Sequence, residues 1–369
     1  MTSAVASPAE ATVTSLRASA YTVPTETRES DGTFEWDSTT LVLVELEADG
    51  EHGLGWTYGA GATARLIDDL LAPLVLGHSV LEIGAAHAAM RAALRNVGQP
   101  GVGATAVSAV DVALWDLKAK LVGLPLALLL GGTRASVPIY GSGGFCSYSD
   151  RRLAEQLAGW VTDGIPRVKM KIGRDHARDG ERVRVAREAI GDDAELYVDA
   201  NGAYSPKQAL GLAARLAELD VTWFEEPVSS RNVEGLRLVR ESAPAGMEIA
   251  AGEYAWSPAD FRDLVGAVDC LQADATRCGG VTGLLAAAAL AEANELDLSG
   301  HTAPTIHTHA LCGIARLRHL EWFQDHVLIE RRFFDGFVEP VDGAVRPDLS
   351  RAGLGVDFRR ADAAAFAVR

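Results

Sequence analysis

The fold is decided by four short segments between residues 168 and 253: VKMKIG (168–173), YVDAN (197–201), WFEEP (223–227) and AAGE (250–253). Each segment is a short apolar run that carries charged side chains at or near its end. The acidic residues Asp199, Glu225 and Glu253 are spaced 26 and then 28 residues apart. Lys171 precedes Asp199 by another 28 residues. Because this spacing fits one strand plus one helix, we expect the charged residues to end successive strands of a parallel sheet.

The same spacing continues on both sides of these segments. We expect four further strands at VPIYGSG (137–143), CLQADA (270–275), LDLSGHT (296–302) and RHLEW (318–322). Amphipathic stretches such as PKQALGLAARLAEL (206–219) separate the strands and read as helices. Eight strands that alternate with helices are typical of a closed (β/α)8 barrel of the TIM type, an α/β fold in which all strand ends meet at one mouth.

The region before the barrel has a different pattern. Residues 37–60 alternate apolar and polar side chains around a turn at Asp49 and Gly50, which predicts a strand hairpin, and residues 62–130 then become helical. We therefore expect an α+β N-terminal capping domain over 1–132 and the barrel over 133–345. A C-terminal segment, 346–369, has no expected strand partner and should return to the capping domain.

Composition limits the possible partners. The chain has 369 residues, 48% of them hydrophobic, and a formal net charge of −16. This acidic balance argues against binding to nucleic acid or to an anionic membrane, since both require basic surface. The N-terminal residues lack the pattern of an export signal, no apolar stretch approaches the ~20 residues of a membrane span, and the four cysteines form no C-x-x-C pair. We expect a cytoplasmic protein with reduced thiols.

The three acidic strand ends suggest a metal site. Mg²⁺ prefers oxygen ligands, so Asp199, Glu225 and Glu253 at one barrel mouth can hold it and leave positions for substrate oxygens and water. The alternative is that these acids are solvated or paired with basic side chains. Glu226 follows Glu225 directly and should point to the opposite face, whereas Asn201 should share the face of Asp199 and can hydrogen-bond in the pocket.

Lys169 and Lys171 are two residues apart, so both should face the barrel interior. They are two of only five lysines in the chain, and their segment is otherwise apolar. Two ammonium groups beside a dication disfavour each other's charge, which should lower at least one pKa and supply a base near neutral pH. The alternative is a pair of solvated surface lysines.

Asp274 and His301 lie on the next two strands beyond the carboxylates. A carboxylate beside one ring nitrogen fixes the histidine tautomer and raises the basicity of the other nitrogen, which makes a competent acid or base. Glu321 on the eighth strand can reach a bound substrate or serve in the core, and Ser142 on the first strand can hydrogen-bond a carboxylate. The remaining histidines of the later strands and helices are interpreted as structural: His307, His309, His319 and His326.

This set of residues suits removal of a proton next to a carboxylate. A metal bound to the carboxylate, with a lysine nearby, stabilises the negative charge that develops. With both lysines charged, the metal, two lysines and three carboxylates sum to about +1, so the site can attract an acid despite the acidic surface. We expect a small anionic hydroxy acid as the substrate.

The succession of K-x-K, D-x-N, EEP, GE, Asp and His, with ALWDLKAK (113–120) and LLGG (129–132) ahead of it, resembles the mandelate racemase-like group of the enolase superfamily. The resemblance implies Mg²⁺ on the three carboxylates, Lys171 as a base assisted by Lys169, and an Asp274–His301 dyad on the other face. It further implies that Glu321 hydrogen-bonds the substrate carboxylate. A capping loop placed at 21–36 should cover the pocket, and the chain should form a homo-oligomer.

Two overall reactions remain open, with a preference for the first. If the histidine protonates a departing β-hydroxyl, the enzyme is an acid-sugar dehydratase that forms a 2-keto-3-deoxy acid. If it instead reprotonates the carbon from the opposite face, the enzyme is a racemase or epimerase. Two remoter alternatives are a Schiff-base aldolase, which leaves the three carboxylates without a role, and a non-catalytic binding barrel.

Overall fold

The computed structural model describes residues 11–368 and contains the expected barrel. Its eight parallel strands are β4 (Val137–Gly143), β5 (Arg167–Lys171), β6 (Glu195–Asp199), β7 (Val221–Glu225), β8 (Glu248–Ala251), β9 (Cys270–Ala273), β10 (Asp297–Gly300) and β11 (Leu317–Phe323). Each strand pairs with the next along the chain, and β11 pairs with β4 to close the barrel. All eight strands coincide with the apolar segments that the sequence analysis identified.

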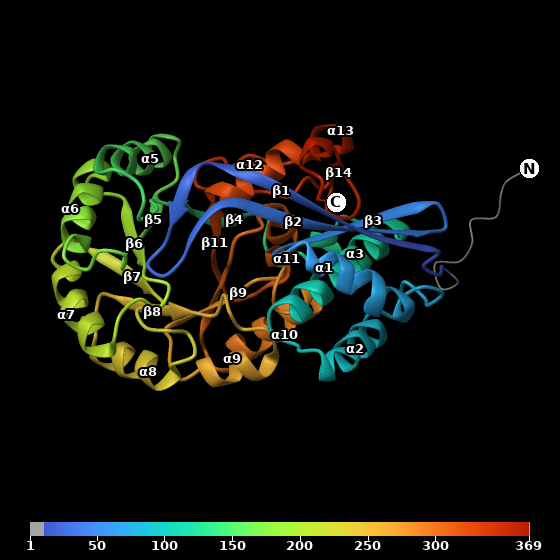
Figure 1. Ribbon diagram of the computed structural model, residues 1–369, viewed down its shortest axis with the longest axis horizontal. Coiled ribbons are helices and arrows are strands. Elements are labelled where there is room, and N and C mark those ends of the chain that lie inside the picture. The colour runs from blue at the N-terminus through green and yellow to red at the C-terminus, as the bar shows by residue number, and fades with distance from the viewer. Residues whose placement is uncertain (1–10, 369) are drawn as a thin grey trace, which may run out of the picture.

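Eight helices surround the strands (Figure 1). They are α5 (Asp150–Thr162), α6 (Asp179–Ile190), α7 (Pro206–Ala217), α8 (Val233–Ser242), α9 (Pro258–Leu264), α10 (Gly280–Ala293), α11 (Pro304–Ala310) and α12 (Gln324–Phe333). Helix α7 shows why they form. Ser205 and Gln208 make a reciprocal capping box at its start, and its apolar residues recur at helical spacing and are buried against the sheet: Ala209, Leu212, Ala213 and Leu216.

Alternation along the strands sets what lies inside the barrel. Tyr140, Tyr197 and Trp223 lie two residues before Ser142, Asp199 and Glu225, so they point to the same inner face. With Ala250 and Cys270, these aromatic side chains form a separate buried cluster. The Lys169 ammonium group lies 5.2 Å from the centre of the Tyr140 ring. The charged residues at the barrel mouth therefore rest on a packed aromatic floor.

The capping domain contains a three-stranded antiparallel sheet of β1 (Ser15–Ser30), β2 (Glu35–Ala48) and β3 (Glu51–Tyr58). The expected hairpin corresponds to β2 and β3, but the expectation of a loop at 21–36 is wrong, since most of that segment belongs to β1. Residues 15–24 pair with β2 in regular register, which shifts only between Pro24 and Glu29. The long β1–β2 hairpin reaches from the capping domain across the barrel (Figure 1).

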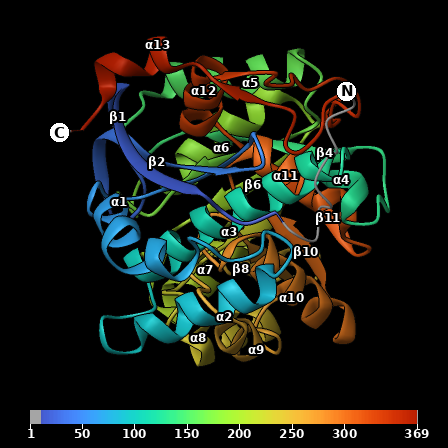
Figure 2. The same cartoon turned by 90° about the vertical axis from the view of Figure 1, so that its right-hand side faces the viewer.

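The helices of this domain are α1 (Ala62–Leu66), α2 (Ile83–Ala93), α3 (Val102–Leu121) and α4 (Leu126–Leu129). Helix α3 is almost fully buried and lies between the sheet and the barrel (Figure 2). It approaches β3 so closely that a Cβ atom on Gly55 would lie 2.2 Å from the carbonyl oxygen of Ala109. Only glycine permits this approach, which fixes the position of α3 against β3.

The C-terminal segment has a strand partner, contrary to the expectation. Residues Asp357–Phe358 (β14) pair with Phe334–Asp335 (β12), and Ala344–Val345 (β13) pairs with the first barrel strand. The segment also contacts the capping sheet, because the Val368 amide donates to the Ala20 carbonyl at 2.8 Å and Arg360 in α13 (Arg360–Ala363) pairs with Glu45. The C-terminal segment therefore contacts both the barrel region and the capping domain, and the division at 132/133 and 345/346 stays a prediction.

A search of the described helices finds no segment long and apolar enough to cross a membrane.

Candidate active site

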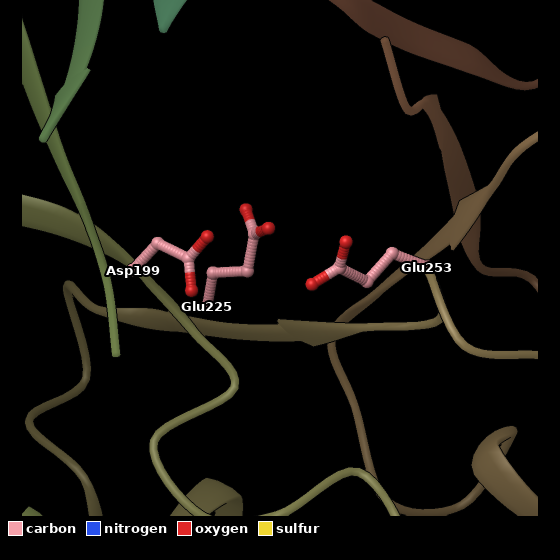
Figure 3. A group of neighbouring side chains, drawn as sticks. All are labelled: Asp199, Glu225 and Glu253. Atoms are coloured by element: carbon pink, nitrogen blue, oxygen red, sulfur yellow. The ribbon is translucent and has the colours of Figure 1, made fainter. Parts of the chain in front are cut away.

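Three carboxylates meet at the barrel mouth. Asp199 ends β6, Glu225 ends β7 and is in register with Asp199, and Glu253 follows β8. One oxygen from each lies within 4.8 Å of the others, and all three side chains are buried. Figure 3 shows Asp199 and Glu253 on either side of Glu225, with their carboxylates turned toward a shared space. Within residues 11–368, Glu225 Oε1 is buried without a hydrogen-bond partner. This all-oxygen donor set fits Mg²⁺.

Both lysines of β5 reach these carboxylates. Lys169 Nζ lies 2.6 Å from Glu225 Oε2, 2.8 Å from Glu321 Oε1 and 3.6 Å from Asp199 Oδ2, and Lys171 pairs directly with Asp199. Burial favours a lower pKa for Lys169, but Glu225, Glu321 and Asp199 raise it well above its usual value. The pKa of Lys171 is raised as well, against burial and mainly by Asp199.

The expectation that at least one lysine has a lowered pKa applies to two ammonium groups beside a bound dication, and it stays a prediction. The two ammonium groups do repel each other, and this repulsion favours a lower pKa for Lys171. The nearby carboxylates Asp199, Glu225 and Glu321 outweigh this repulsion, and a dication bound to two of them would weaken their effect on the lysines.

His301 approaches from the other side. Its Nδ1 lies 2.8 Å from Asp274 Oδ2, and its Nε2 lies 2.8 Å from Glu253 Oε2 and 3.4 Å from Glu321 Oε2. Burial opposes protonation of the ring, but Glu253, Glu321 and Asp274 raise the pKa of His301 to about 9. The same contacts hold the pKa of Asp274 below its usual value despite burial. His301 is thus placed to carry a proton at neutral pH, with Nε2 toward the carboxylates.

The side chains predicted to bind substrate have different surroundings. Ser142 donates from its hydroxyl to Glu321 Oε1 at 2.6 Å, and both residues are buried. Asn201 donates from Nδ2 to Glu253 Oε1 at 3.1 Å. Glu321 and Asn201 line the cavity at the barrel mouth, whereas Ser142 is not among its lining residues in the described chain. Ser142 therefore contacts the site through Glu321.

Glu226 does not follow the simple alternation expected of a strand. Its φ of 37° lies in the left-handed region, so the residue has left the extended conformation of β7. Its carboxyl is buried, and burial together with the charges of Glu253, Asp199 and Glu225 raises its pKa well above the usual value. Glu226 is nevertheless not part of the group of three carboxylates that could hold a metal, and it lines a different cavity from Lys171 and His301.

The cavity at the barrel mouth has a volume of about 300 Å³ and contains side chains that strand counting did not find. Arg277, after β9, lies 3.1 Å from Glu253 Oε2 and 3.5 Å from Asp274 Oδ2. Several further lining residues belong to the capping domain or to α12 and the residue before it: Asp31, Phe34, Trp36, Thr39, Tyr58, Phe323, Asp325 and His326. The capping hairpin therefore contributes to the pocket, as expected.

The loop that carries Asp274 and Arg277 is held by the capping domain. Thr57 donates from its hydroxyl to the Thr276 carbonyl at 2.6 Å. The Gly279 amide donates to Ser108 Oγ at 2.9 Å, and the Thr282 amide donates to Asp111 Oδ1 at 3.0 Å. Because Ser108 and Asp111 lie on α3, the position of this helix fixes the loop after β9.

Comparisons with known proteins agree with the fold and the site. The model "Mandelate racemase / muconate lactonizing enzyme, N-terminal domain" matches residues 18–131, and the model "Enolase C-terminal domain-like" matches residues 152–363. A 3,6-anhydro-alpha-L-galactonate cycloisomerase of Streptomyces coelicolor is 34% identical over 94% of this chain and 97% of its own length.

An L-talarate/galactarate dehydratase of Salmonella typhimurium is 33% identical over 76% of this chain and 73% of its own length. Its crystal structure liganded with Mg and L-lyxarohydroxamate has a TM-score of 0.89, with 28% identity over the whole of this chain and 96% of that one. A mandelate racemase/muconate lactonizing enzyme-like protein from Rubrobacter xylanophilus has a TM-score of 0.95 and 54% identity, covering 97% of this chain and 100% of that one. The chain therefore belongs to the mandelate racemase/muconate lactonizing enzyme family of the enolase superfamily.

Proposed function

We propose that the chain is a Mg²⁺-dependent acid-sugar dehydratase. One observation carries the proposal: Lys171 contacts the carboxylate set at Asp199, and His301 contacts it at Glu253, on the other side of Glu225. A substrate carbon held above these carboxylates would face a base on one side and an acid on the other. The similarity to an L-talarate/galactarate dehydratase supports a sugar acid as the substrate and water as the leaving group.

Asp199, Glu225 and Glu253 would hold the metal. When bound, Mg²⁺ supplies positive charge that stabilises the substrate carboxylate as negative charge develops on it. Lys169 adds a second positive charge, fixed in place by Glu225 and Glu321. The proposed site therefore favours a substrate whose carboxylate becomes more negative during the reaction.

The protein residues then move two protons. Lys171, as the free amine, takes the proton from the carbon next to the carboxylate, and the electron pair of that C–H bond moves toward the carboxylate. His301, as the imidazolium, gives its Nε2 proton to the β-hydroxyl as the C–O bond breaks, so water leaves. Asp274 holds the Nδ1–H at 2.8 Å and keeps the ring oriented. The resulting enol takes up a proton at the β-carbon and becomes the 2-keto-3-deoxy acid.

Racemisation or epimerisation is the second candidate, because the same two-sided placement of Lys171 and His301 favours it. In that case His301 returns a proton to the α-carbon on the face opposite Lys171. The two reactions differ in their products, since only dehydration yields a keto acid. Both begin with removal of the α-hydrogen.

A screen of sugar acids and α-hydroxy acids with Mg²⁺ in deuterated water tests the proposal. We expect keto-acid formation with at least one sugar acid and deuterium at C3 of that keto acid, because the enol takes its proton from solvent at the β-carbon. Deuterium uptake with inverted configuration and no keto acid would favour the racemase instead. Borohydride inactivation that depends on a carbonyl substrate and survives chelation would favour a Schiff-base aldolase, and binding of acids without any exchange would favour a non-catalytic barrel.

We further propose that the protein acts in the cytoplasm as a homo-oligomer on a small anionic hydroxy acid, without nucleic-acid or membrane partners. The acidic net charge of −16 supports the last part of this proposal. Light scattering of the purified protein measures the oligomeric state, and a single monomeric species at micromolar concentration would contradict it.

A further inference from the structure

His326 lies in the first turn of α12 and lines the same cavity as Lys171 and His301. It is only 5% exposed. One face of its ring stacks on Tyr58 from the capping domain, with ring centres 3.4 Å apart and an interplanar angle of 12°. Phe323 packs against it edge to face at 5.2 Å and 89°. The ring is therefore clamped between the two domains and has little freedom to rotate.

The contacts of His326 fix where its proton sits. The backbone amide of Ala303 donates to Nδ1 at 3.3 Å. Because an amide can only donate, Nδ1 must carry the lone pair, and the proton of the neutral ring must lie on Nε2. Burial lowers the pKa of His326 well below its usual value, and the nearby cations His301 and Arg277 add to this effect against Asp274. The ring is thus an uncharged donor at neutral pH.

Nε2 is the polar atom of this ring that remains for a ligand. No residue of 11–368 accepts a hydrogen bond from it. Buried polar atoms without a partner occur elsewhere in the described chain, but Nε2 of His326 is not one of them, so this atom is accessible from the cavity. Since Nδ1 is turned toward the backbone after β10 and Tyr58 covers one ring face, the remaining polar edge is open to the cavity that His326 lines. An uncharged N–H at this position can donate a hydrogen bond to a hydroxyl or carboxylate oxygen of a ligand.

The other charges of the cavity distinguish between these two acceptors. Arg277 is paired with Glu253 and Asp274, and Lys171 is paired with Asp199. The part of the cavity formed by the capping hairpin and α12 adds two acidic side chains, Asp31 and Asp325, and no lysine or arginine among its described lining residues. A second carboxylate on the substrate would meet acidic groups without a free cation there.

Resting on the proposed function, we propose that the cavity selects a polyhydroxylated acid with a single carboxylate, and that His326 Nε2–H donates to a hydroxyl oxygen of its chain. The carboxylate of such an acid is held at the metal end of the cavity, and its uncharged chain extends toward His326 and Tyr58. His326 neither takes nor gives a proton in the proposed reaction, so its role is to select the substrate.

Acids that differ only at the far end of the chain test this proposal. Gluconate and glucarate form one such pair, and galactonate and galactarate form another. For the wild-type enzyme with Mg²⁺, we expect kcat/KM to favour the monoacid of the productive pair by at least about tenfold. A preference for the diacid would overturn the proposal.

Three substitutions then assign the preference to His326. We expect His326→Phe to raise KM for the monoacid about tenfold while kcat changes less than about threefold, and His326→Gln, which keeps an uncharged donor, to recover part of the loss. His326→Arg should shift the preference toward the diacid. Unchanged KM in the Phe variant, or an unchanged preference in the Arg variant, would overturn the assignment.

His307→Gln serves as the matched control. His307 contacts the same backbone turn, with Nδ1 2.7 Å from the Thr302 carbonyl oxygen and Nε2 accepting from the Ala275 amide, but it is not among the cavity-lining residues. If His326 acted only by holding the turn, both substitutions would lower kcat without changing the ratio between monoacid and diacid. That result would overturn the proposal.

A measurement on the bound state separates this proposal from the proposed function. In protein labelled with ¹⁵N-histidine, the His326 signal, assigned from the Gln variant, should report protonated Nε2 and unprotonated Nδ1 at pH 7. Gluconate or galactonate should shift the Nε2 signal, whereas glycolate, which has no hydroxyl chain, should not. If no acid undergoes exchange or dehydration, the proposed function fails, and these signals still decide the role of His326. A doubly protonated ring would overturn it.

Discussion

The two sides of the site are supported by different parts of the chain. On the lysine side, the hydrogen-bond and ion-pair partners of Lys169 and Lys171 within residues 11–368 all belong to barrel strands. On the histidine side, the loop after β9 that carries Asp274 and Arg277 is held by Thr57, Ser108 and Asp111 of the capping domain. The barrel alone therefore defines the proposed base, whereas both domains define the proposed acid.

This difference separates the two proton transfers. Abstraction of the α-proton needs the lysine side, and departure of the hydroxyl needs the histidine side as well. Changes in the capping domain should then affect loss of water more than exchange of the α-hydrogen. The following experiments test this separation, beginning with the change that should remove both activities.

Removal of the metal should have the largest effect because both sides share the carboxylate set. Dialysis against EDTA should lower deuterium exchange and keto-acid formation by at least about a thousandfold, and added Mg²⁺ should restore both. Glu225→Gln should weaken Mg²⁺ binding, measured by titration calorimetry, because it removes one of three negative ligands. Full activity after complete chelation would contradict the metal-dependent mechanism.

Substitution of the proposed base and the proposed acid should separate the two sides. Lys171→Ala should reduce both exchange and keto-acid formation by about 10²–10⁴-fold. His301→Asn should reduce keto-acid formation by a similar factor while leaving measurable exchange at the α-carbon, followed by NMR in deuterated water. Equal loss of exchange in both variants would show that the lysine side does not act alone.

A change in the capping domain should have a smaller and selective effect. Thr57→Val removes the hydrogen bond to the Thr276 carbonyl, so we expect keto-acid formation to fall about threefold to tenfold while exchange is retained. The free energy of unfolding should fall by about 1–2 kcal/mol, measured with denaturant. Thr14→Val is the matched control, since it removes a threonine bond to the Glu47 carbonyl in the same sheet, away from the barrel. An equal loss of product in both variants would disprove the selective effect.

The smallest effect concerns pH and the domain interface. Burial raises the pKa of Glu330 from 4.5 to about 7, against hydrogen bonds from Thr305, Trp56 and Tyr58. Because the folded state holds this proton more tightly than the unfolded state, its contribution to stability is complete below pH 4.5 and is lost as the pH rises through 7. The wild type should thus lose up to about 3 kcal/mol relative to Glu330→Gln between pH 4.5 and 7.

Urea unfolding of both proteins across this pH range measures the difference. The Gln variant lacks the titrating group, so its stability should change less with pH over the same interval. It should also be less stable than the wild type near pH 4.5, because the amide nitrogen cannot accept hydrogen bonds at a site with three donors. Parallel curves for the two proteins would show that Glu330 does not titrate in this range.

Strand counting located the groups at the barrel mouth because a parallel barrel repeats one unit. A charged residue that follows each apolar run must therefore lie at the same end of the barrel. This rule places Asp199, Glu225 and His301 at the barrel mouth from the sequence alone. The rule fails as soon as the backbone leaves the strand. Glu226 follows a strand end in a left-handed conformation, and nothing in the letters EEP signals this change.

Residues outside the repeat were less accessible to prediction. Tyr58 and Trp36 reach the cavity from a separate domain, which meets the barrel through close packing such as that of Gly280 in α10 against Asp111 in α3. His326 was interpreted as structural because its helix, not a strand, brings it to the cavity. The sequence spacing also did not show that Glu321, from the eighth strand, adds to the carboxylates that raise the pKa of Lys169.

The pairing of β11 with β4 also bears on how the protein matures. Glu321, on the eighth and last strand of the barrel, supplies one of the anions around Lys169, and Ser142 on the first strand of the barrel donates to it. A nascent chain that stops before residue 317 can pair Lys169 with Asp199 and Glu225, but it lacks Glu321 and the strand that closes the barrel. The set of charges around Lys169 is therefore complete only once the eighth barrel strand has been synthesised.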